Sequence, residues 1–353
     1  MLSTQQCEEL REHLTRAQNP VFYYDNDADG LCAFLLLRRF LGRGKGVAVR
    51  SYPGLHHTYA RKAQELGADA VFILDKPVLD PAFLTALRAL AIPIIWVDHH
   101  ESNVPSPFTP GEDFFIYNPM YGTPASSEPV TYWAQRVCRR GEDLWIAVMG
   151  CIADHYLPDF AATFAETHPD LWAKGIDQPF DAYYRTEIGR LARALNFGLK
   201  DSATHVVHLQ NYLISCLHPT ELFADVAGNS AFRRMYDKLH TRYQALLEEA
   251  EGCKEADLIF FSYGGRTSMS SELSNELAYR SGGCFVAVAY TNAGITNVSL
   301  RGTNVKEILE RILPCLTHAR GGGHKDAVGA RIQSKELELF HRLLSEEISH
   351  GHV

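Results

Sequence analysis

The 353-residue sequence contains no C-x-x-C pair, and its eight cysteines are scattered along the chain. A zinc ribbon and a disulfide framework are therefore disfavoured. The sequence also has no excess of positive charge, since 34 Lys and Arg face 42 Asp and Glu, a net charge of −8. That balance argues against a protein that coats nucleic acid by bulk positive charge. It leaves open an enzyme that gathers its carboxylates around metal ions.

Long apolar runs are missing as well. The run that ends at Leu37 is stopped by Arg38 and Arg39, far short of a membrane span. Residues 1–14 carry several charges and no apolar core, so we expect no signal peptide. With 46% hydrophobic and 22% charged residues, the composition is that of a globular protein long enough for two domains. We expect it in a reducing compartment, the cytoplasm, with no membrane partner.

Short apolar runs alternate with amphipathic stretches from residue 20 onward. This rhythm predicts an α/β fold with a parallel sheet covered on both faces. The expected strands are 21–24, 46–50, 70–74 and 93–97, with a helix over 31–41. Residues 102–129 are rich in proline, serine and glycine and predict a long loop, interrupted by a short strand-like run at 114–117.

The rest of the chain divides into a helical stretch and a second α/β region. A buried helix is expected over 142–152, followed by a weakly apolar helical stretch from about 180 to 250. The second region has expected strands at 258–261, 284–290, 297–300 and 327–332 and helices at 271–280, 305–313 and from 336. We therefore divide the chain into a parallel-sheet domain (1–185), a helical connector (186–252) and a smaller C-terminal α/β domain (253–353).

The acidic turn Asp25-x-Asp27-x-Asp29-Gly30 directly follows the first expected strand. Three alternate carboxylates repel one another at short range, and a divalent cation with oxygen ligands removes that cost. A solvated acidic turn is the alternative. A calcium EF-hand fails because its twelfth position is Leu36 rather than glutamate.

Acidic and histidine residues also end two later strands. Asp75 follows the third strand, and Asp98-His99-His100 follows the fourth. Because the carboxyl ends of parallel strands meet at one edge of a sheet, these residues can converge with the acidic turn. Imidazole nitrogens suit manganese, zinc or iron. Asp154, which follows the expected helix 142–152, and Asp75 could each be an ordinary cap when taken singly.

The C-terminal region holds the glycine run Gly321-Gly322-Gly323 followed by His324. Successive glycines allow backbone amides to converge on an anion, and the histidine adds a donor. A flexible loop is the commoner meaning of such a run. Arg301 ends the strand 297–300 and could bind a phosphate in the same domain, or could simply be solvated.

Taken in order, these motifs resemble the DHH phosphoesterase superfamily, in the branch with a C-terminal DHHA1 domain. Residues 25–30 resemble its first motif, Asp75 the second, Asp98-His99-His100 the motif that names the family, Asp154 the fourth, and Gly321–His324 the GGGH signature of DHHA1. The resemblance spans about residues 20 to 350 and is greatest to archaeal RecJ-like and nano-RNase-like proteins.

The resemblance implies two manganese ions, or magnesium in their place. The first would be held by Asp27 and Asp75, and the second by Asp29, Asp75, His99 and Asp154. His100 and Asp98 are the implied catalytic residues, with His100 facing the scissile phosphate. Arg301 and Gly321–His324 would bind a substrate phosphate. Several branches start the first motif with a metal-binding histidine, whereas this chain has Asp25, as RecJ-type members do, which gives Asp25 that role.

The implied activity is hydrolysis of single-stranded DNA, RNA or short oligonucleotides to mononucleotides by a water activated between two cations. One alternative is a phosphatase or phosphodiesterase acting on a small nucleotide, such as a dinucleotide, a cyclic dinucleotide or 3′-phosphoadenosine phosphate. The other is a catalytically silent nucleic-acid-binding scaffold. The sequence leaves the choice between DNA and RNA, the direction of cleavage and the oligomeric state open.

Overall fold

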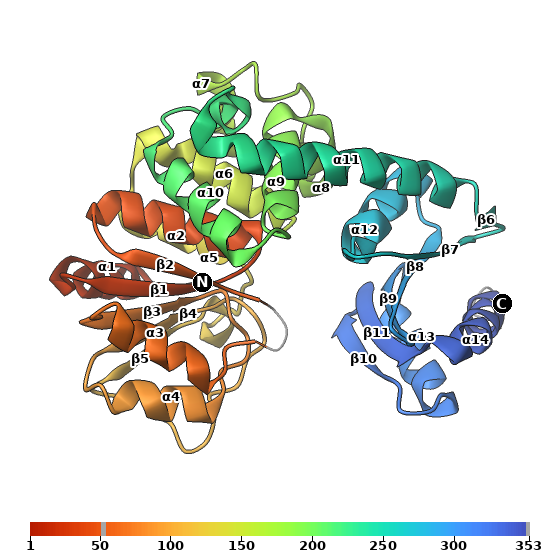
Figure 1. Cartoon of the computed structure of the whole chain (residues 1–353), viewed down its shortest axis with the longest axis horizontal. Helices are drawn as coiled ribbons and strands as arrows, with labels where there is room; N and C mark the ends of the chain where they lie inside the picture. Colours follow the sequence, from red (N-terminus) through yellow and green to blue (C-terminus); the bar gives the residue numbers. More distant parts are fainter. Residues whose placement is uncertain (51–53, 351–353) are drawn as a thin grey trace. The chain divides into compact units, whose positions relative to one another are not determined.

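The computed structural model describes residues 1–50 and 54–350 and divides into two compact units, Met1–Tyr236 and Asp237–Val353. Each unit has its own sheet (Figure 1). The α/β fold class predicted from the sequence is confirmed. The division at residues 185 and 252 stays a prediction. Among the described residues, no helix combines the length and apolar character that a membrane span requires.

The first unit contains a five-stranded sheet whose paired strands are all parallel. Its strands are β1 (Pro20–Asp25), β2 (Lys45–Val49), β3 (Ala70–Leu74), β4 (Ile94–Val97) and β5 (Phe114–Tyr117). They lie in the order β2-β1-β3-β4-β5. The first four confirm the predicted strands, and the short run at 114–117 proves to be the fifth member of the sheet.

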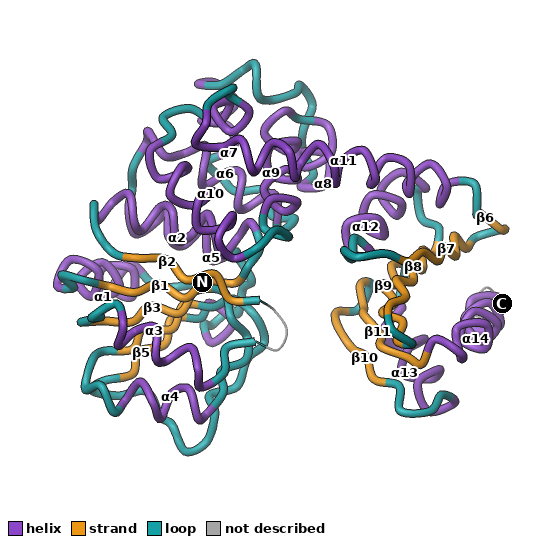
Figure 2. The backbone as a smooth tube through the Cα atoms, viewed as in Figure 1, coloured by secondary structure: helices purple, strands orange, loops and turns teal. Residues whose placement is uncertain are grey.

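Helices cover both faces of this sheet (Figure 2). The helices of the first unit are α1 (Thr4–Arg16), α2 (Ala28–Leu41), α3 (Ala60–Glu65), α4 (Pro81–Arg88), α5 (Val130–Cys138), α6 (Leu144–Ala153), α7 (Ala161–Thr167), α8 (Pro179–Arg185), α9 (Glu187–Gly198) and α10 (Ala203–Ser215). A long helix, α11 (Ser230–Glu251), begins in the first unit and continues into the second.

The three central strands of the first sheet, β1, β3 and β4, are buried on both faces, and their side chains alternate between those faces. Tyr23 of β1 packs edge-on against Phe83 of α4 on one face. Tyr24, the next residue, stacks on Phe34 of α2 on the other face. The near-continuous apolar strands predicted from the sequence therefore carry two layers of helix.

The second unit contains a six-stranded mixed sheet. Its strands are β6 (Lys254–Glu255), β7 (Leu258–Gly264), β8 (Phe285–Asn292), β9 (Ile295–Arg301), β10 (Arg320–His324) and β11 (Ala327–Gln333), in the order β10-β11-β9-β8-β7-β6. Its helices are α12 (Ser270–Ser281), α13 (Val305–Ile312) and α14 (Leu337–His350). Only β7 and β8 pair in parallel among the described strands of this sheet.

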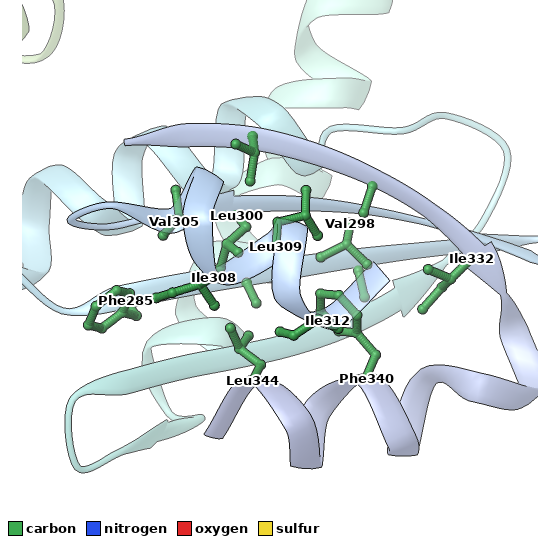
Figure 3. Packing of buried hydrophobic residues seen from close by; sticks show 14 of the residues in the cluster. Phe285, Val298, Leu300, Val305, Ile308, Leu309, Ile312, Ile332, Phe340 and Leu344 are labelled. Carbon is green, nitrogen blue, oxygen red and sulfur yellow. The ribbon is translucent and has the colours of Figure 1, made fainter. Parts of the chain in front are cut away.

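One buried apolar cluster holds the second unit together (Figure 3). Alternate residues of β9, such as Val298 and Leu300, point toward α13 and α14, which contribute Leu309 and Phe340. Ser299 lies between those two β9 residues and instead hydrogen-bonds Ser270 of α12, so α12 lies on the opposite face.

The glycine run is not a flexible loop, the alternative that its composition left open. Residues 320–324 form the exposed edge strand β10, which pairs antiparallel with β11. A Cβ on Gly321 would lie 2.6 Å from the Gly329 carbonyl oxygen, and Gly323 has a φ of +143°. Close pairing with β11 thus requires glycine at these two positions, and that pairing overrides the low strand propensity of glycine.

Candidate metal centre

The strand order of the first sheet places a topological switch point between β1 and β3, because the chain leaves β1 in one direction and β3 in the other. In open parallel sheets, ligands bind outside the carboxyl ends of the strands at such a point. Asp25 ends β1, Asp75 follows β3, and Asp98 and His99 follow β4. The predicted convergence of strand ends is therefore present.

The acidic turn between β1 and α2 is shaped by its own hydrogen bonds. Asp27 is the N-cap of α2 and accepts from the Gly30 amide at 2.9 Å. A Cβ at Gly30 would lie 2.5 Å from the Asp25 carbonyl oxygen, so only glycine allows this close turn. The turn therefore brings Asp25, Asp27 and Asp29 to the amino end of one helix, where the helix dipole favours negative charge.

Asp29 is buried and joins α2 to α5. Its two carboxylate oxygens accept from the amides of Val130 and Thr131, at 2.9 and 2.8 Å, in the first turn of α5. The Thr131 hydroxyl donates to the Asp29 carbonyl oxygen at 2.8 Å. A carboxylate has about four lone-pair positions, so these bonds fix Asp29 while leaving acceptor capacity for a cation.

Asp75 and Asp154 approach the turn from two other segments. Asp75 is buried and has a left-handed φ of 59°, an unfavourable conformation for a residue other than glycine. Its amide donates to the Val97 carbonyl oxygen at 2.9 Å, which ties it to β4. Asp154 is the C-cap of α6, the helix predicted to carry it.

His99 lies between these two carboxylates. Its Nε2 is 3.4 Å from Asp75 Oδ1 and 3.6 Å from Asp154 Oδ2. Its Nδ1 is 3.2 Å from the Ser127 carbonyl oxygen, which can only accept. Nδ1 therefore carries a proton, and in the neutral ring the Nε2 lone pair points toward the carboxylates, as in a metal-ligating histidine.

The ligand atoms form three overlapping groups within the described residues. Each group has its atoms within 4.8 Å of one another, and the groups are Asp25, Asp27 and Asp75; Asp29, His99 and Asp154; and Asp75, His99 and His100. Asp75 belongs to two groups. All six residues predicted as ligands (Asp25, Asp27, Asp29, Asp75, His99 and Asp154) thus come together at one sheet edge.

Burial and mutual repulsion dominate the electrostatics of this cluster. Burial, followed by the charge of Asp29, raises the pKa of Asp75 to about 8 and that of Asp154 to about 7. Burial and the neighbouring Asp75 raise the pKa of Asp27 well above its usual range. Burial opposes protonation of His99, but the charge of Asp75, whose Oδ1 lies 3.4 Å from Nε2, outweighs it and raises the pKa of His99 to about 11.

Two buried atoms at the centre test whether the site fits a metal. Asp75 Oδ1 and His99 Nε2 have no hydrogen-bond partner among the described residues. Leaving such atoms unpaired is costly, and each such case needs an explanation. A carboxylate oxygen and an imidazole nitrogen suit a divalent cation such as manganese, so the residues fit the metal that the sequence predicts.

His100 is held differently from His99. Its Nδ1 is 3.0 Å from Asp98 Oδ1, and its amide donates to Asp98 Oδ2 at 3.3 Å. Asp98 is fully buried, and its Oδ2 also accepts from Asn118 at 3.4 Å. Asp98 thus orients His100 from behind, so that the ring presents Nε2 away from Asp98.

Three contacts at the site escape sequence reasoning. Asn118 supports Asp98, Ser127 fixes the proton on His99, and the Lys76 ammonium lies 3.1 Å from Asp25 Oδ1. Asn118 and Ser127 lie within the segment predicted as loop. Lys76 differs from other lysines of the chain in being buried, and the burial of one lysine cannot be predicted from the sequence.

The predicted phosphate-binding residues lie in the second unit. Arg301 is in register with Ala327, which is in register with His324, so the two residues occupy one cross-strand row. Residues in such a row point to the same face of a sheet. Asn275 and Ser271 accept from the Arg301 guanidinium at 2.6 and 3.2 Å, which fixes its direction.

Comparisons with known proteins agree with this architecture. Residues 257–350 match the family model of the DHHA1 domain. The chain is similar in fold to RecJ from Thermus thermophilus in complex with Mn2+, with a TM-score of 0.63 and 17% identity over 99% of this chain and 55% of RecJ. It therefore spans about half the length of that protein. A complex of the same RecJ with Mg2+ also matches, with a TM-score of 0.56 and 16% identity over 99% of this chain and 52% of RecJ.

Another similar structure is an exopolyphosphatase-related protein from Bacteroides fragilis, with a TM-score of 0.53 and 15% identity. That match covers 98% of this chain and 96% of the other. Among the curated proteins, none matches this chain. Sequence identities of 17%, 16% and 15% to these structures show that the fold is shared and no more than that.

Proposed function

We propose that this chain, whose residues 257–350 match the DHHA1 domain and whose fold is similar to that of RecJ, is a metal-dependent phosphoesterase of the DHH/DHHA1 superfamily that hydrolyses single-stranded nucleic acid or short oligonucleotides. The observation that carries the proposal is the unsatisfied centre of the carboxylate cluster. Asp75 Oδ1 and His99 Nε2 face one another at 3.4 Å, and neither buried atom has a hydrogen-bond partner among the described residues. A pair of divalent cations would satisfy both atoms.

In this proposal the ligands are drawn from the six residues of the cluster, and Asp75 would serve both ions. Manganese and magnesium both occur in the similar RecJ structures. When bound, such ions lower the pKa of a water and stabilise negative charge on the phosphoryl group. The chain itself fixes the ligand directions: Ser127 and the α5 amides hold His99 and Asp29 in place before any cation arrives.

His100 is the proposed catalytic residue beside the ions. Its Nδ1–H donates to Asp98, so Nε2 is available to contact a phosphate oxygen. Asp98 acts through His100 and is a positioning residue in this account. Loss of the Asp98 carboxylate would misorient the His100 ring. It would also leave the proton free to move from Nδ1 to Nε2, as in other carboxylate–histidine pairs.

A row of aromatic rings favours a substrate with nucleobases. His155 follows Asp154 in the chain and stacks on Phe180 of α8, with ring centroids 4.2 Å apart and planes at 18°. Phe180 is 36% exposed, and Tyr184 lies nearly parallel to it, at 12°. The guanidinium of Arg193 lies over the Tyr184 ring, 5.4 Å from its centroid. Rings combined with a cation are typical of single-strand binding.

The aromatic row is anchored to the acidic turn. Asn196 accepts from the Ala28 amide at 3.0 Å and donates to the Tyr183 hydroxyl at 3.2 Å. Tyr183 in turn contacts His155 edge-on. The row is therefore held beside the ligand cluster from two directions, through Asp154 and through Asn196.

A phosphatase or phosphodiesterase acting on a small nucleotide is the second candidate. The match over nearly the whole length of an exopolyphosphatase-related protein favours it. The nucleobase of a small nucleotide would still stack on the aromatic row, whereas a polyphosphate has no base to stack there. A silent scaffold is the third possibility that the fold allows.

The test is a manganese-supplemented assay with labelled dinucleotides and longer DNA and RNA strands, resolved by product length. Digestion of long strands supports the first candidate, and activity on dinucleotides alone supports the second. No hydrolysis of any of them would contradict both. Phe180→Ala should raise KM for an oligonucleotide on the order of tenfold, as loss of a stacked base does, and leave hydrolysis of a phosphodiester without a base unchanged.

A further inference from the structure

Lys76 is a buried cation inside the carboxylate cluster. It directly follows Asp75, and its side chain is only 4% exposed. Its ammonium lies 3.1 Å from Asp25 Oδ1, and the Asp25 side chain is itself 14% exposed. Burial of an ammonium is costly unless it is paired, so this contact sets where Lys76 points.

The Asp25 oxygen that receives the ammonium is already engaged. Asp25 Oδ1 also accepts from the Asn26 amide at 2.9 Å. In the described part of the chain, no lysine forms an ion pair with Asp27 or Asp75, the other members of that ligand group. One ammonium and one divalent cation together would neutralise the three carboxylates of the group.

We propose that Lys76 is a positioning residue that holds Asp25 as its counter-ion, so that Asp25 does not ligate the first metal ion. The inference rests on the proposed function of the cluster as a divalent-cation centre. The first ion would then be held by Asp27 and Asp75. The ion held by Asp29, His99 and Asp154 has more protein ligands and binds more tightly.

A purely structural role for Lys76 explains less. Its backbone carbonyl oxygen accepts from the Trp96 indole at 2.9 Å, so the chain after β3 is fixed without the ammonium. A methionine would fill the same space with an uncharged side chain. The positive charge of Lys76 therefore acts on Asp25. Removing that charge should change the affinity of the cluster for metal ions.

The experiment is calorimetric titration of the metal-free full-length chain with Mn2+. The wild-type chain should show a tighter and a weaker class of site. In Lys76→Met the Asp25 carboxylate loses its ammonium partner and can join the first ion, so the weaker class should tighten by about tenfold, as it does on addition of a charged ligand. Lys62→Met is the matched control, because Lys62 pairs with Glu65 on the surface and should leave both classes unchanged.

The double variant Asp25→Asn/Lys76→Met decides between a counter-ion and a ligand. It removes one charge of each sign, so the net charge of the cluster is preserved. We expect two classes of Mn2+ site within about threefold of wild type, since the ligands are intact. Loss of the weaker class in this variant would overturn the inference, because Asp25 would then be a ligand.

Three further results complete the test. Asp25→Asn alone should retain two classes, and loss of one would again identify Asp25 as a ligand. Unchanged binding in a folded Lys76→Met chain, checked by circular dichroism, would show that Lys76 does not restrain Asp25. Binding of no Mn2+ by the wild-type chain would overturn the proposed function itself, and this inference with it.

Discussion

Two buried carboxylates of the first unit, Asp143 and Asp75, are treated in opposite ways. Asp143 is completely buried, and each of its oxygens receives a guanidinium: Arg39 at 2.7 Å and Arg140 at 2.6 Å. Asp75 is similarly buried, but its neighbours are other carboxylates and the imidazoles of His99 and His100, at 3.4 and 3.7 Å, rather than guanidinium groups. Its Oδ1 has no hydrogen-bond partner in the described part of the chain.

The difference separates a structural ion pair from a binding site. Arg39 also donates to the carbonyl oxygens of Ile214 and Cys216 at the end of α10, at 2.9 and 2.6 Å, so the charge of Asp143 helps to join α2 to α10. Around Asp75 the chain provides more negative charge than its own cations balance. A buried charge that is left uncompensated points to a cation from outside the chain.

The largest effect should come from replacing Asp75 with asparagine. Hydrolysis should fall on the order of 10³-fold or more, as it does on loss of a group central to catalysis. The metal-free variant should melt at the same temperature or higher, because a repelled carboxylate is removed. Melting curves and turnover with manganese check both statements, and near-normal manganese-dependent turnover would refute the bridging role.

Asp143→Asn should behave in the reverse way. It leaves Arg39 and Arg140 without their shared carboxylate, and the free energy of unfolding should fall by about 3–5 kcal/mol. Mn2+ affinity of the fraction that remains folded should stay close to wild type. Denaturant unfolding gives the first value and calorimetry the second. If Asp143→Asn lost Mn2+ binding and kept its stability, Asp143 would belong to the metal site and would not be a purely structural ion pair.

The pH dependence of stability gives a third contrast. Asp75, with a pKa of about 8, and His99, at about 11, both hold protons in the folded metal-free chain that the unfolded chain releases at lower pH. Folding thus binds protons, and metal-free stability should fall as pH rises from about 5.5 to 8. Mn2+ competes with those protons, so the increase in Tm that it causes should grow over the same range.

Thermal melts with and without Mn2+ measure this effect directly. Asp75→Asn serves as the control, because it removes one of the two proton-binding groups and should flatten the pH dependence of the metal-free Tm. A Mn2+ effect that shrinks with rising pH would mean that the carboxylates are not the ligands.

The smallest effect is expected in the second unit. His324→Ala should raise KM by about tenfold while leaving Mn2+ binding unchanged, because the residue is predicted to bind a substrate phosphate. Arg301→Lys should act in the same direction, since a lysine does not reproduce the fork of donors that Asn275 and Ser271 fix. Unchanged KM in both variants would exclude the row of Arg301 and His324 as a phosphate site.

The sequence predicts the sheet edge well because local patterns determine it. The apolar runs that become β1, β3 and β4 are each followed by acidic residues or histidine, and parallel strands bring such ends together. Asp29, His99 and Asp154 come from three separate segments. The strand ends predict that the acidic turn and His99 meet, whereas Asp154 is assigned to the site only through the resemblance to the DHH motifs.

What the sequence misses depends on contacts between distant segments. Ser127 and Asn118 look like ordinary loop residues, and only the folded chain brings them to His99 and Asp98. The glycine run has the composition of a loop, and pairing with β11 turns it into a strand. Lys76 carries no motif, since its importance comes from being buried beside Asp25.

The most direct test of the central claim is anomalous diffraction at the manganese absorption edge from crystals of the chain grown with MnCl2. We expect two anomalous peaks at the carboxyl edge of the first sheet, with Asp75 in contact with both and His99 Nε2 in contact with one. No peak at Asp75, or peaks only at carboxylates elsewhere on the chain, would contradict it.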